Sequence, residues 1–355
     1  MSGDREVTVV SYAIGSYGGM ESQLERLVHE LLARDVRVTA IAALCDMPDS
    51  DQLDIVRVRG PRGPFLLYFP WFLVAGTISV ARNRRGVVYT LGAATLNRAD
   101  VRKIPFSQLA FERSRHYAPR ASRSTMAHRL NARLTAAFGR SMERLLYRPA
   151  LTKRLVATST GDALELEAIF GPGMTPVPTI PNGVDCDRFQ PDPAARRAVR
   201  AAEGLSADDP VAVFVGGDWG RKGLRLVVDA LKLAPQWTLL VAGSGDAAAE
   251  LEYARAAGVG DRLRFFGRVP DVERILAASD VIVNPSAYEP FGNAVLEGMA
   301  CGLPAIVARA NGVSDFVDGH ATGRFVERDA DAIADALIEL EDRELRTRLG
   351  TNARM

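Results

Sequence analysis

Two hydrophobic periods alternate along the chain. Residues 7–13 form an apolar run of strand length, and residues 36–42 form another. Between them, residues 21–33 place apolar side chains on one helical face, at Leu24, Leu27, Val28 and Leu31. This spacing predicts a strand, an amphipathic helix and a second strand. Strands and helices in this order are typical of a doubly wound α/β domain, whose ligand lies at the carboxyl ends of the strands.

A second block with the same alternation follows residue 187. Segments with helical spacing separate four apolar runs of strand length, at residues 212–215, 238–242, 263–266 and 281–284. A chain of 355 residues is long enough for two domains of ordinary size. The sequence therefore predicts an α/β protein with two Rossmann-like domains that face each other across a cleft, residues 1–186 and residues 187–355.

One segment departs from this alternation. Residues 64–81 carry no charge and are rich in large apolar side chains, but Pro64, Pro70 and Gly76 interrupt them. A membrane-spanning helix needs roughly 20 mainly apolar residues, so we do not expect a span. We expect a buried helix that leads into a strand at residues 86–90. The alternative is a segment that dips into a membrane surface between flanking arginines, at Arg59, Arg62, Arg82, Arg84 and Arg85.

Candidate chemistry is concentrated around two glutamates, Glu289 and Glu297. Pro290 and Gly292 break the chain after a buried strand, and residues 294–301 have the spacing of a packed helix. Glu289 is therefore expected on a strand-to-helix loop and Glu297 on the first turns of the helix. Taken singly, each could be a solvated surface acid. Backbone N–H groups at a helix start favour an anion, and here they belong to Phe291, Gly292 and Asn293.

This segment resembles the Glu-x7-Glu signature of retaining, family 4 type glycosyltransferases of GT-B fold, which bind a nucleotide sugar there. The resemblance is strong over residues 180–345 and weaker before them. It implies that Glu289 holds sugar hydroxyls near the reaction centre and that Glu297 binds ribose hydroxyls. It also implies donor-binding positions in both domains, at Gly18, Gly19, Val269, Pro290, Phe291, Gly292 and Asn293.

A second cluster is the run Val215-Gly-Gly-Asp-Trp-Gly-Arg-Lys-Gly223, in which Arg221 and Lys222 precede a helix expected at residues 224–233. Two fixed cations suit a diphosphate whose leaving oxygen gains charge as the glycosidic bond breaks. The run is not an NTPase phosphate loop, because Arg221 interrupts the Gly-Lys pair and Gly223 replaces the Mg²⁺-binding Ser or Thr. The resemblance, closest here to lipopolysaccharide-core glucosyltransferases, implies catalytic roles for Arg221 and Lys222 and a donor contact for Gly217.

Weaker motifs complete the resemblance. Residues 180–189 look like the domain-linking loop of the family, and residues 311–315 resemble its Gly-x-x-Glu segment with Asp315 in place of Glu. Two Asp-x-Asp runs, at residues 49–51 and 185–187, spell the metal motif of another glycosyltransferase fold. A Mg²⁺ site needs converging oxygen ligands, and we read neither run as one. We predict no metal and no cofactor, the donor being a UDP- or GDP-sugar.

The histidines depart from the family pattern. Relatives carry His near the strand at residues 86–90 and after the next strand, where this chain has Tyr89 or Leu91 and then Pro105 and Gln108. Its own histidines lie elsewhere, at His29, His116, His128 and His320. The sequence also stops at Met355, so we expect the terminal crossover helix of the family to be absent.

The charge distribution concerns the partners. Residues 102–154 hold 13 basic and two acidic side chains, although the whole chain has a formal net charge of +1. Such a segment attracts phospholipid, a phosphorylated lipid carrier, an acidic glycan or nucleic acid, unless it is simply a solvated helical face. We expect an anionic membrane surface and no nucleic acid. Three scattered cysteines and a start without a signal-peptide pattern predict a cytoplasmic protein, peripheral at the inner membrane face.

These features together predict a retaining, metal-independent hexosyltransferase whose acceptor is a glycan, a lipid-linked molecule or a small molecule. Arg221 and Lys222 would stabilise the departing diphosphate, which would itself take the proton of the acceptor hydroxyl and so make a missing His tolerable. Two alternatives stay open: a sugar-nucleotide epimerase of the same fold, and a catalytically weak homologue that binds a nucleotide sugar or a partner.

Overall fold

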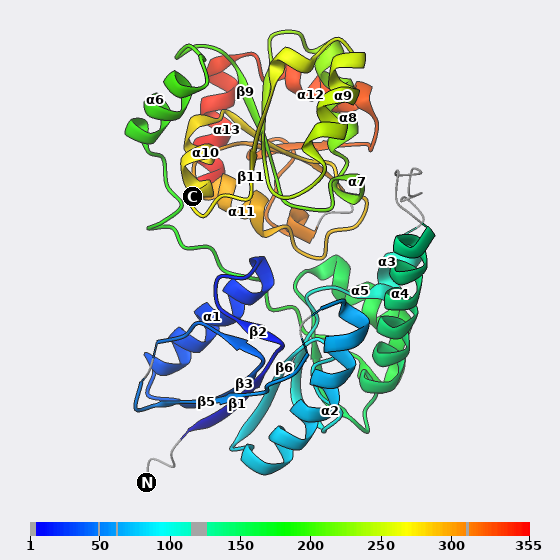
Figure 1. Cartoon of the computed structure of the whole chain (residues 1–355). Coiled ribbons are helices and arrows are strands. Elements are labelled where there is room, and N and C mark those ends of the chain that lie inside the picture. Colours follow the sequence, from blue (N-terminus) through cyan, green and yellow to red (C-terminus); the bar gives the residue numbers. More distant parts are fainter. Residues whose placement is uncertain (1–4, 49, 62, 115–125, 310–311) are drawn as a thin grey trace. The chain divides into compact units, whose positions relative to one another are not determined.

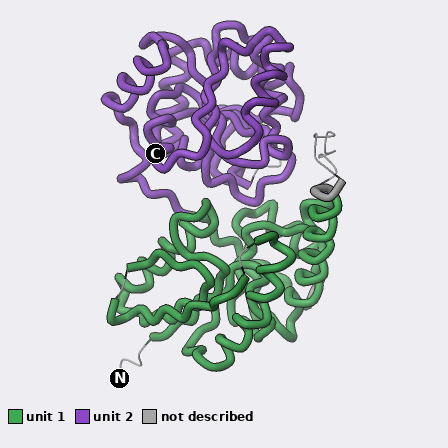
Figure 2. Tube along the Cα trace, viewed as in Figure 1, with its two compact units in different colours: residues 1–113, 121–182 green, residues 114–120, 183–355 purple. Residues whose placement is uncertain are grey.

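The protein is described by a computed structural model over residues 5–48, 50–61, 63–114, 126–309 and 312–355. The chain divides into two compact units, and the main part of the second, residues 183–355, begins after Asn182 (Figure 2). This division comes slightly before the expected boundary at residue 186. Each unit has a six-stranded, all-parallel sheet with helices on both faces (Figure 1). The predicted α/β class, with two doubly wound domains, is confirmed.

Unit 1 has the strand order β5-β3-β1-β6-β7-β8. The strands are β1 (Glu6–Val10), β3 (Arg37–Ala42), β5 (Leu53–Arg57), β6 (Val87–Leu91), β7 (Ala99–Lys103) and β8 (Thr152–Val156), with a small separate pair, β2 (Ala13–Ile14) and β4 (Leu44–Cys45). The helices are α1 (Gly19–Leu32), α2 (Phe65–Asn83), α3 (Gln108–Arg113), α4 (Met126–Leu146) and α5 (Thr160–Phe170), followed by the 3-10 turn η1 (Pro172–Met174).

Unit 2 has the strand order β11-β10-β9-β12-β13-β14. The strands are β9 (Val211–Val215), β10 (Thr238–Ala242), β11 (Leu263–Gly267), β12 (Val281–Asn284), β13 (Ala305–Ala308) and β14 (Gly323–Val326). The helices are α6 (Pro193–Ala202), α7 (Trp219–Lys222), α8 (Leu224–Leu233), α9 (Ala247–Ala256), α10 (Val272–Ala278), α11 (Asn293–Ala300), α12 (Ala330–Glu339) and α13 (Arg343–Arg354), with 3-10 turns η2 (Gly260–Arg262) and η3 (Gly312–Asp315).

Alternating side chains of the central strands build two cores in unit 2. On β9, Ala212 and Phe214 pack into one core together with α8, α9 and α12. Val211 and Val213 pack into the other core, together with α10 and α11. Because successive side chains of a strand point to opposite faces, a strand buried on both faces reads as the continuous apolar run seen in the sequence. The sheet is thus fixed from both sides, and its carboxyl edge is held in place.

Helix α2 confirms the helix expected at residues 64–81, but the expectation that it is buried is wrong for one of its faces. Phe72, Leu73, Gly76 and Val80 are buried against the sheet. The opposite face exposes a continuous apolar stripe, with exposed fractions of 54% for Leu67, 52% for Trp71, 55% for Val74 and 47% for Ile78. Within the described residues, α2 is the one helix long and apolar enough to cross a membrane by length and composition.

The basic segment at residues 102–154 is not a uniform surface. Arg102 is fully buried, and its guanidinium donates to Thr152 Oγ1 at 2.9 Å and to the Gly92 carbonyl at 2.8 Å. Farther along, α4 exposes Arg133 and Arg144. Residues 115–125 of the segment lie outside the described residues. The charge of this segment is therefore partly a structural element of β7 and partly a helical surface.

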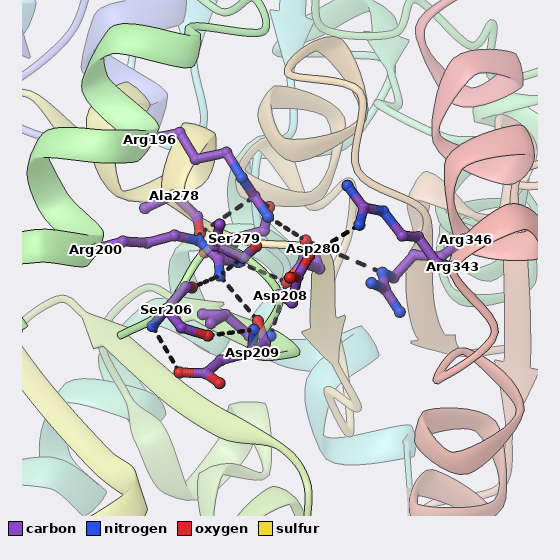
Figure 3. Close-up of polar contacts among 12 residues, drawn as sticks. Arg196, Arg200, Ser206, Asp208, Asp209, Ala278, Ser279, Asp280, Arg343 and Arg346 are labelled. Carbon is purple, nitrogen blue, oxygen red and sulfur yellow. Dashed lines mark hydrogen bonds and ion pairs between the residues drawn. The ribbon is translucent and has the colours of Figure 1, made fainter. Parts of the chain in front are cut away.

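An arginine cluster ties helices to the amino edge of the sheet in unit 2 (Figure 3). Asp280, immediately before β12, pairs with Arg196 of α6 at 2.8 Å and with Arg200 of α6 at 2.7 Å. Arg346 of α13 lies 4.0 Å away. Arg200 also donates to the carbonyls of Ala278, Ser206 and Asp209. One carboxylate thus joins α6, β12 and α13.

Candidate functional site

The strand order of unit 2 creates a switch point between β9 and β12. These strands are hydrogen-bonded neighbours, although β10 and β11 come between them in the sequence. The chain leaves β9 towards one edge of the sheet and leaves β12 towards the other, so the loops after the two strands diverge. Ligands of doubly wound sheets bind outside the carboxyl ends of the strands at such a point. Arg221 and Lys222 follow β9, and Glu289 follows β12.

Arg221 and Lys222 lie on a single helical turn, α7, which the sequence did not predict. Asp218 caps this turn in a left-handed backbone conformation, and its carboxylate accepts from Arg221 Nε at 2.9 Å. Arg221 also donates to the carbonyl of Tyr288, on the loop after β12. In the other direction, the Ala287 N–H donates to the Arg221 carbonyl at 2.9 Å. The loops after β9 and β12 are therefore joined at their backbones.

Lys222 reaches Glu289 along a path that requires glycine at position 216. Its ammonium donates to Glu289 Oε2. A Cβ on Gly216 would lie 2.8 Å from Lys222 Cε, and Gly216 has a φ of 131°, a conformation that side chains rarely adopt. The glycine run after β9 thus makes room for the lysine side chain.

The Arg221, Lys222 and Glu289 side chains form a mostly buried ion cluster. Their exposed fractions are 13%, 11% and 14%, and Arg221 Nη1 lies 3.5 Å from Glu289 Oε2. Burial opposes ionisation of Glu289, but the charges of Lys222 and Arg221 outweigh it and lower the pKa of the carboxyl group below its ordinary value. The cluster therefore contains an ionised carboxylate beside two cations, able to accept hydroxyl hydrogens and to meet phosphate oxygens.

Helix α11 begins directly beyond this cluster. Gly292 is its N-cap in a left-handed conformation, with a φ of 93°, and Asn293 is its first residue. The Gly312 N–H donates to the Glu289 carbonyl at 2.7 Å. Glu297, the second predicted acid, is partly buried on α11. Its charge adds to burial in raising the pKa of the Cys301 thiol to about 12.

The remaining predicted residues lie at several places. Gly217 continues the turn before α7, and Val269 packs against the core beneath α10. Pro290 and Phe291 belong to the loop between β12 and α11, with Phe291 buried. In unit 1, Gly18 caps α1 and Gly19 begins it. The structure brings Arg221, Lys222 and Glu289 into contact; it describes Gly18 and Gly19 within the other unit.

The histidines and parts of the weaker motifs are either exposed or lie outside the described residues. His29 and His320 are exposed, and His116 and the side chain of His128 lie outside the described residues. Asp49 and Asn311, from two of the weaker motifs, lie outside them as well. Within the described residues, no three His, Cys, Asp or Glu side chains gather in a way that could hold a metal ion.

Sequence reasoning missed two contributors to the cluster. One is Asp218, whose carboxylate orients Arg221; the other is Gly216, which accommodates the Lys222 side chain. The signal was present in the run Gly-Gly-Asp directly after a buried strand, because glycine and aspartate are the residues that adopt left-handed turns and cap helices.

Two protein families match the chain. Residues 17–188 match the family described as Glycosyltransferase Family 4. Residues 195–355 match the family described as Glycosyl transferases group 1. The two matched regions agree with the two units, and the second contains the ion cluster.

Curated relatives are similar over part of their length. The chain is 35% identical over 222 residues to D-inositol 3-phosphate glycosyltransferase of Xylanimonas cellulosilytica. The aligned region covers 58% of this chain and 52% of that protein. It is 36% identical over 153 residues to lipopolysaccharide core biosynthesis glycosyltransferase LpsE of Rhizobium meliloti, which covers 42% of this chain and 45% of that protein. The chain spans about half the length of the curated relatives it matches.

Solved structures are similar over nearly the whole chain. The glycosyltransferase WaaG, involved in lipopolysaccharide biosynthesis, has a TM-score of 0.81 at 19% identity, covering 98% of this chain and 94% of WaaG. Sucrose-phosphate synthase of Thermosynechococcus elongatus has a TM-score of 0.77 at 24% identity, covering 99% and 93%. At these identities the likeness concerns the fold, and it confirms the predicted GT-B fold.

Proposed function

We propose that this chain, which belongs to the glycosyltransferases of GT-B fold, moves a hexose from a nucleotide diphosphate sugar to an acceptor hydroxyl. The observation that carries the proposal is the ion cluster of Arg221, Lys222 and Glu289 at the switch point between β9 and β12. A protein of similar fold, HepE of Anabaena, has been solved in complex with UDP and glucose and with UDP-glucose, which supports a UDP-sugar as donor. A GDP-sugar is the other candidate.

Each member of the cluster has a role that follows from its chemistry. Arg221 and Lys222 supply the positive charge that favours the diphosphate of the donor, and Glu289 and the more exposed Asp218 offset part of it. This charge acts most strongly when the leaving oxygen becomes negative, because the cations are already held in place and need not reorganise. Glu289, kept ionised by its two partners, accepts hydrogen bonds from sugar hydroxyls. Glu297 on α11 binds the ribose hydroxyls of the nucleotide.

The transfer is proposed to retain the anomeric configuration and to need no metal. Two fixed cations supply the charge that a Mg²⁺ ion supplies elsewhere. The leaving phosphate oxygen, held by Arg221 and Lys222, takes the proton from the acceptor hydroxyl as the new bond forms, so no histidine is required for that step. Activity is expected to persist in excess EDTA, and the anomeric configuration of the product can be read by proton NMR.

Incubation with radiolabelled UDP- and GDP-hexoses, in the presence of cell extract as the source of acceptor, tests the proposal. Label that moves into a new product supports transfer. An epimerised nucleotide sugar would instead identify a sugar-nucleotide epimerase, and label that is bound but chemically unchanged would identify a binding protein. The R221A/K222A variant serves as the control, since it removes the cluster's cations.

The acceptor is proposed to be a glycan, a lipid-linked molecule or a phosphorylated small molecule. The names of similar proteins cover such a range: one acts on D-inositol 3-phosphate, and another on α-D-GlcNAc-diphosphoundecaprenol. Mass spectrometry of the labelled product, formed from extract and one donor at a time, identifies the acceptor class.

A peripheral place at the cytoplasmic face of a membrane is part of the proposal. Its support is the exposed apolar stripe of α2 together with the basic helix α4. Phe65 and Phe69, outside the stripe, pack α2 against Phe138 of α4. Each well-placed Lys or Arg adds roughly 1 kcal/mol of attraction to an anionic surface. Liposome flotation should show binding to anionic vesicles that fades as salt rises. Equal recovery in the soluble fraction with anionic and neutral vesicles at low salt would argue against it.

A further inference from the structure

Lys103 occupies a position in unit 1 where a ligand is expected. It is the last residue of β7, at the carboxyl edge of the sheet. The N–H of Gly92, just beyond the neighbouring strand β6, donates to the Lys103 carbonyl at 2.8 Å. The switch point of this sheet lies between β1 and β6. Lys103 is therefore one strand away from the place where doubly wound sheets bind their ligands.

The ammonium group of Lys103 is partly buried and has no carboxylate partner. It donates to Asn182 Oδ1 at 2.8 Å, and within the described residues no acidic side chain lies at ion-pair distance from it. Burial alone lowers the pKa of Lys103 to about 8. A buried cation without an opposite charge is costly to a fold. An anion bound from solution would compensate this charge, which the described residues leave without a carboxylate.

Two neighbouring basic side chains show how the chain treats its other cations. Arg102, one residue earlier on β7, is buried but donates to Thr152 Oγ1 and to the Gly92 carbonyl. Lys153 of β8 is exposed and lies 3.9 Å from Asp100. The first is satisfied by internal acceptors and the second by water and an acid. Lys103 has one amide oxygen for three ammonium hydrogens.

We infer that Lys103 and Asn182 form an anion site at the carboxyl edge of unit 1, which takes a phosphate or carboxylate group of the acceptor. The assignment of this anion to the acceptor rests on the proposed function. Asn182 orients the ammonium group, and the two remaining N–H donors bind the anion. Lysine suits this task as a compact charge with rotatable donors. The site would select anionic acceptors over neutral ones.

Competitive amine labelling followed by mass spectrometry tests the site directly. The full-length protein is labelled with acetic anhydride at pH 8 in the presence of inorganic phosphate, of glycerol 3-phosphate or of micelles containing dodecyl phosphate. Glycerol and dodecyl maltoside micelles are the neutral counterparts. We expect the anions to slow labelling of Lys103 severalfold and to leave Lys153 unchanged. Protection by the soluble phosphate indicates a small-molecule acceptor, and protection by the micelles alone indicates a lipid-linked one.

Variants give a second measurement. K103M should weaken binding of the protecting anion about tenfold or more in calorimetry, the usual effect of losing charge-assisted hydrogen bonds. K103R should retain part of the affinity, and K153M all of it. The inference is overturned if no anion protects Lys103, or if K103M binds the anion as tightly as the unchanged protein does. No nucleotide sugar is present in either experiment, so a failure of the proposed transfer activity would leave these results interpretable.

Discussion

Two mostly buried carboxylates lie on either side of β12, and each is held by cations. Asp280, before the strand, is held by Arg196 and Arg200. Glu289, after the strand, is held by Lys222 and Arg221. The residue types and distances are similar, but the positions differ: the first cluster lies at the amino edge of the sheet and the second at the carboxyl edge.

The difference lies in what else the cations bind. Arg200 donates to carbonyls of Ala278, Ser206 and Asp209, so its planar group joins the end of α10 to the loop before β9. Lys222 carries its charge on a compact ammonium group, and its side chain lies against the glycine turn at the switch point. Arg200, which fastens the carbonyls of three residues, is a structural device. Arg221 fastens one carbonyl, that of Tyr288, and Lys222, held by one carboxylate at the switch point, can exchange that contact for a ligand. Ion clusters must therefore be judged by their place in the fold and not by charge alone.

Replacing Arg200 with Met should have the largest effect on stability. The change leaves Asp280 with less compensation and several carbonyls without a donor, which typically costs about 3–5 kcal/mol. Urea unfolding followed by circular dichroism measures the loss. The matched control is R343M, because Arg343 pairs with Asp208 at 2.8 Å but both side chains are exposed; such pairs contribute roughly 0–1 kcal/mol. Equal losses in the two variants would contradict a fastening role for the Asp280 cluster.

The double change R221A/K222A should mainly reduce turnover. Losing one preorganised hydrogen-bond donor to a developing negative charge typically lowers the rate by about 10²–10³. The affinity for the sugar portion of the nucleotide sugar should fall by a smaller factor than the turnover number does. Steady-state kinetics with the donor that the labelling experiment identifies measures both. R225A is the control. Arg225 lies on the neighbouring helix α8 and pairs with Glu250 of α9 at 2.9 Å, outside the cluster. Near-normal turnover in the double variant would place the diphosphate elsewhere.

Glu297→Ala sharpens the comparison by testing an acid outside both clusters. If Glu297 binds ribose hydroxyls, the variant loses charge-assisted hydrogen bonds worth roughly 1.5–3 kcal/mol each. Calorimetry with the free nucleoside diphosphate measures the loss, and E344A, an exposed acid of α13, is the control. Unchanged affinity in a folded E297A protein would remove Glu297 from the nucleotide site.

The sequence predicted those features that depend on local pattern. The helix expected at residues 224–233 has the same bounds as α8, and α11 begins within one residue of its expected start. Glycine and proline mark these boundaries, because they restrict or extend the backbone conformations available. The turn α7, with only four residues, is too short for a periodicity to reveal it.

Features that depend on tertiary packing were not predictable in the same way. Helix α2 is apolar all round, so its sequence could not show that one face packs on the sheet and the other is exposed. Arg102 and Lys103 count as surface charge in the sequence, yet Arg102 is buried and Lys103 is partly buried, because β7 lies between β6 and β8. The contact between Lys222 and Glu289 depends on β9 and β12 becoming neighbours, although 67 residues separate the two side chains.

The smallest expected effect concerns Lys103, a partly buried cation that belongs to neither carboxylate cluster. Its pKa is lowered from 10.5 to about 8 in the folded protein. Below pH 8 both states carry the proton, and the folded state bears the full cost of the buried charge. Between pH 8 and 10.5 the unfolded state binds more protons than the folded state, so this contribution makes stability rise with pH.

K103M should therefore be more stable than the unchanged protein at pH 7, by about 1–3 kcal/mol, and the difference in stability should disappear as the pH approaches 10. Denaturant unfolding of both proteins at pH 7, 8, 9 and 10, with K153M as control, measures it. If K103M is less stable at pH 7, the hydrogen bond to Asn182 outweighs the cost of burying the charge. Lys103 would then have a structural role, like the arginines that hold Asp280, and would not form an anion site.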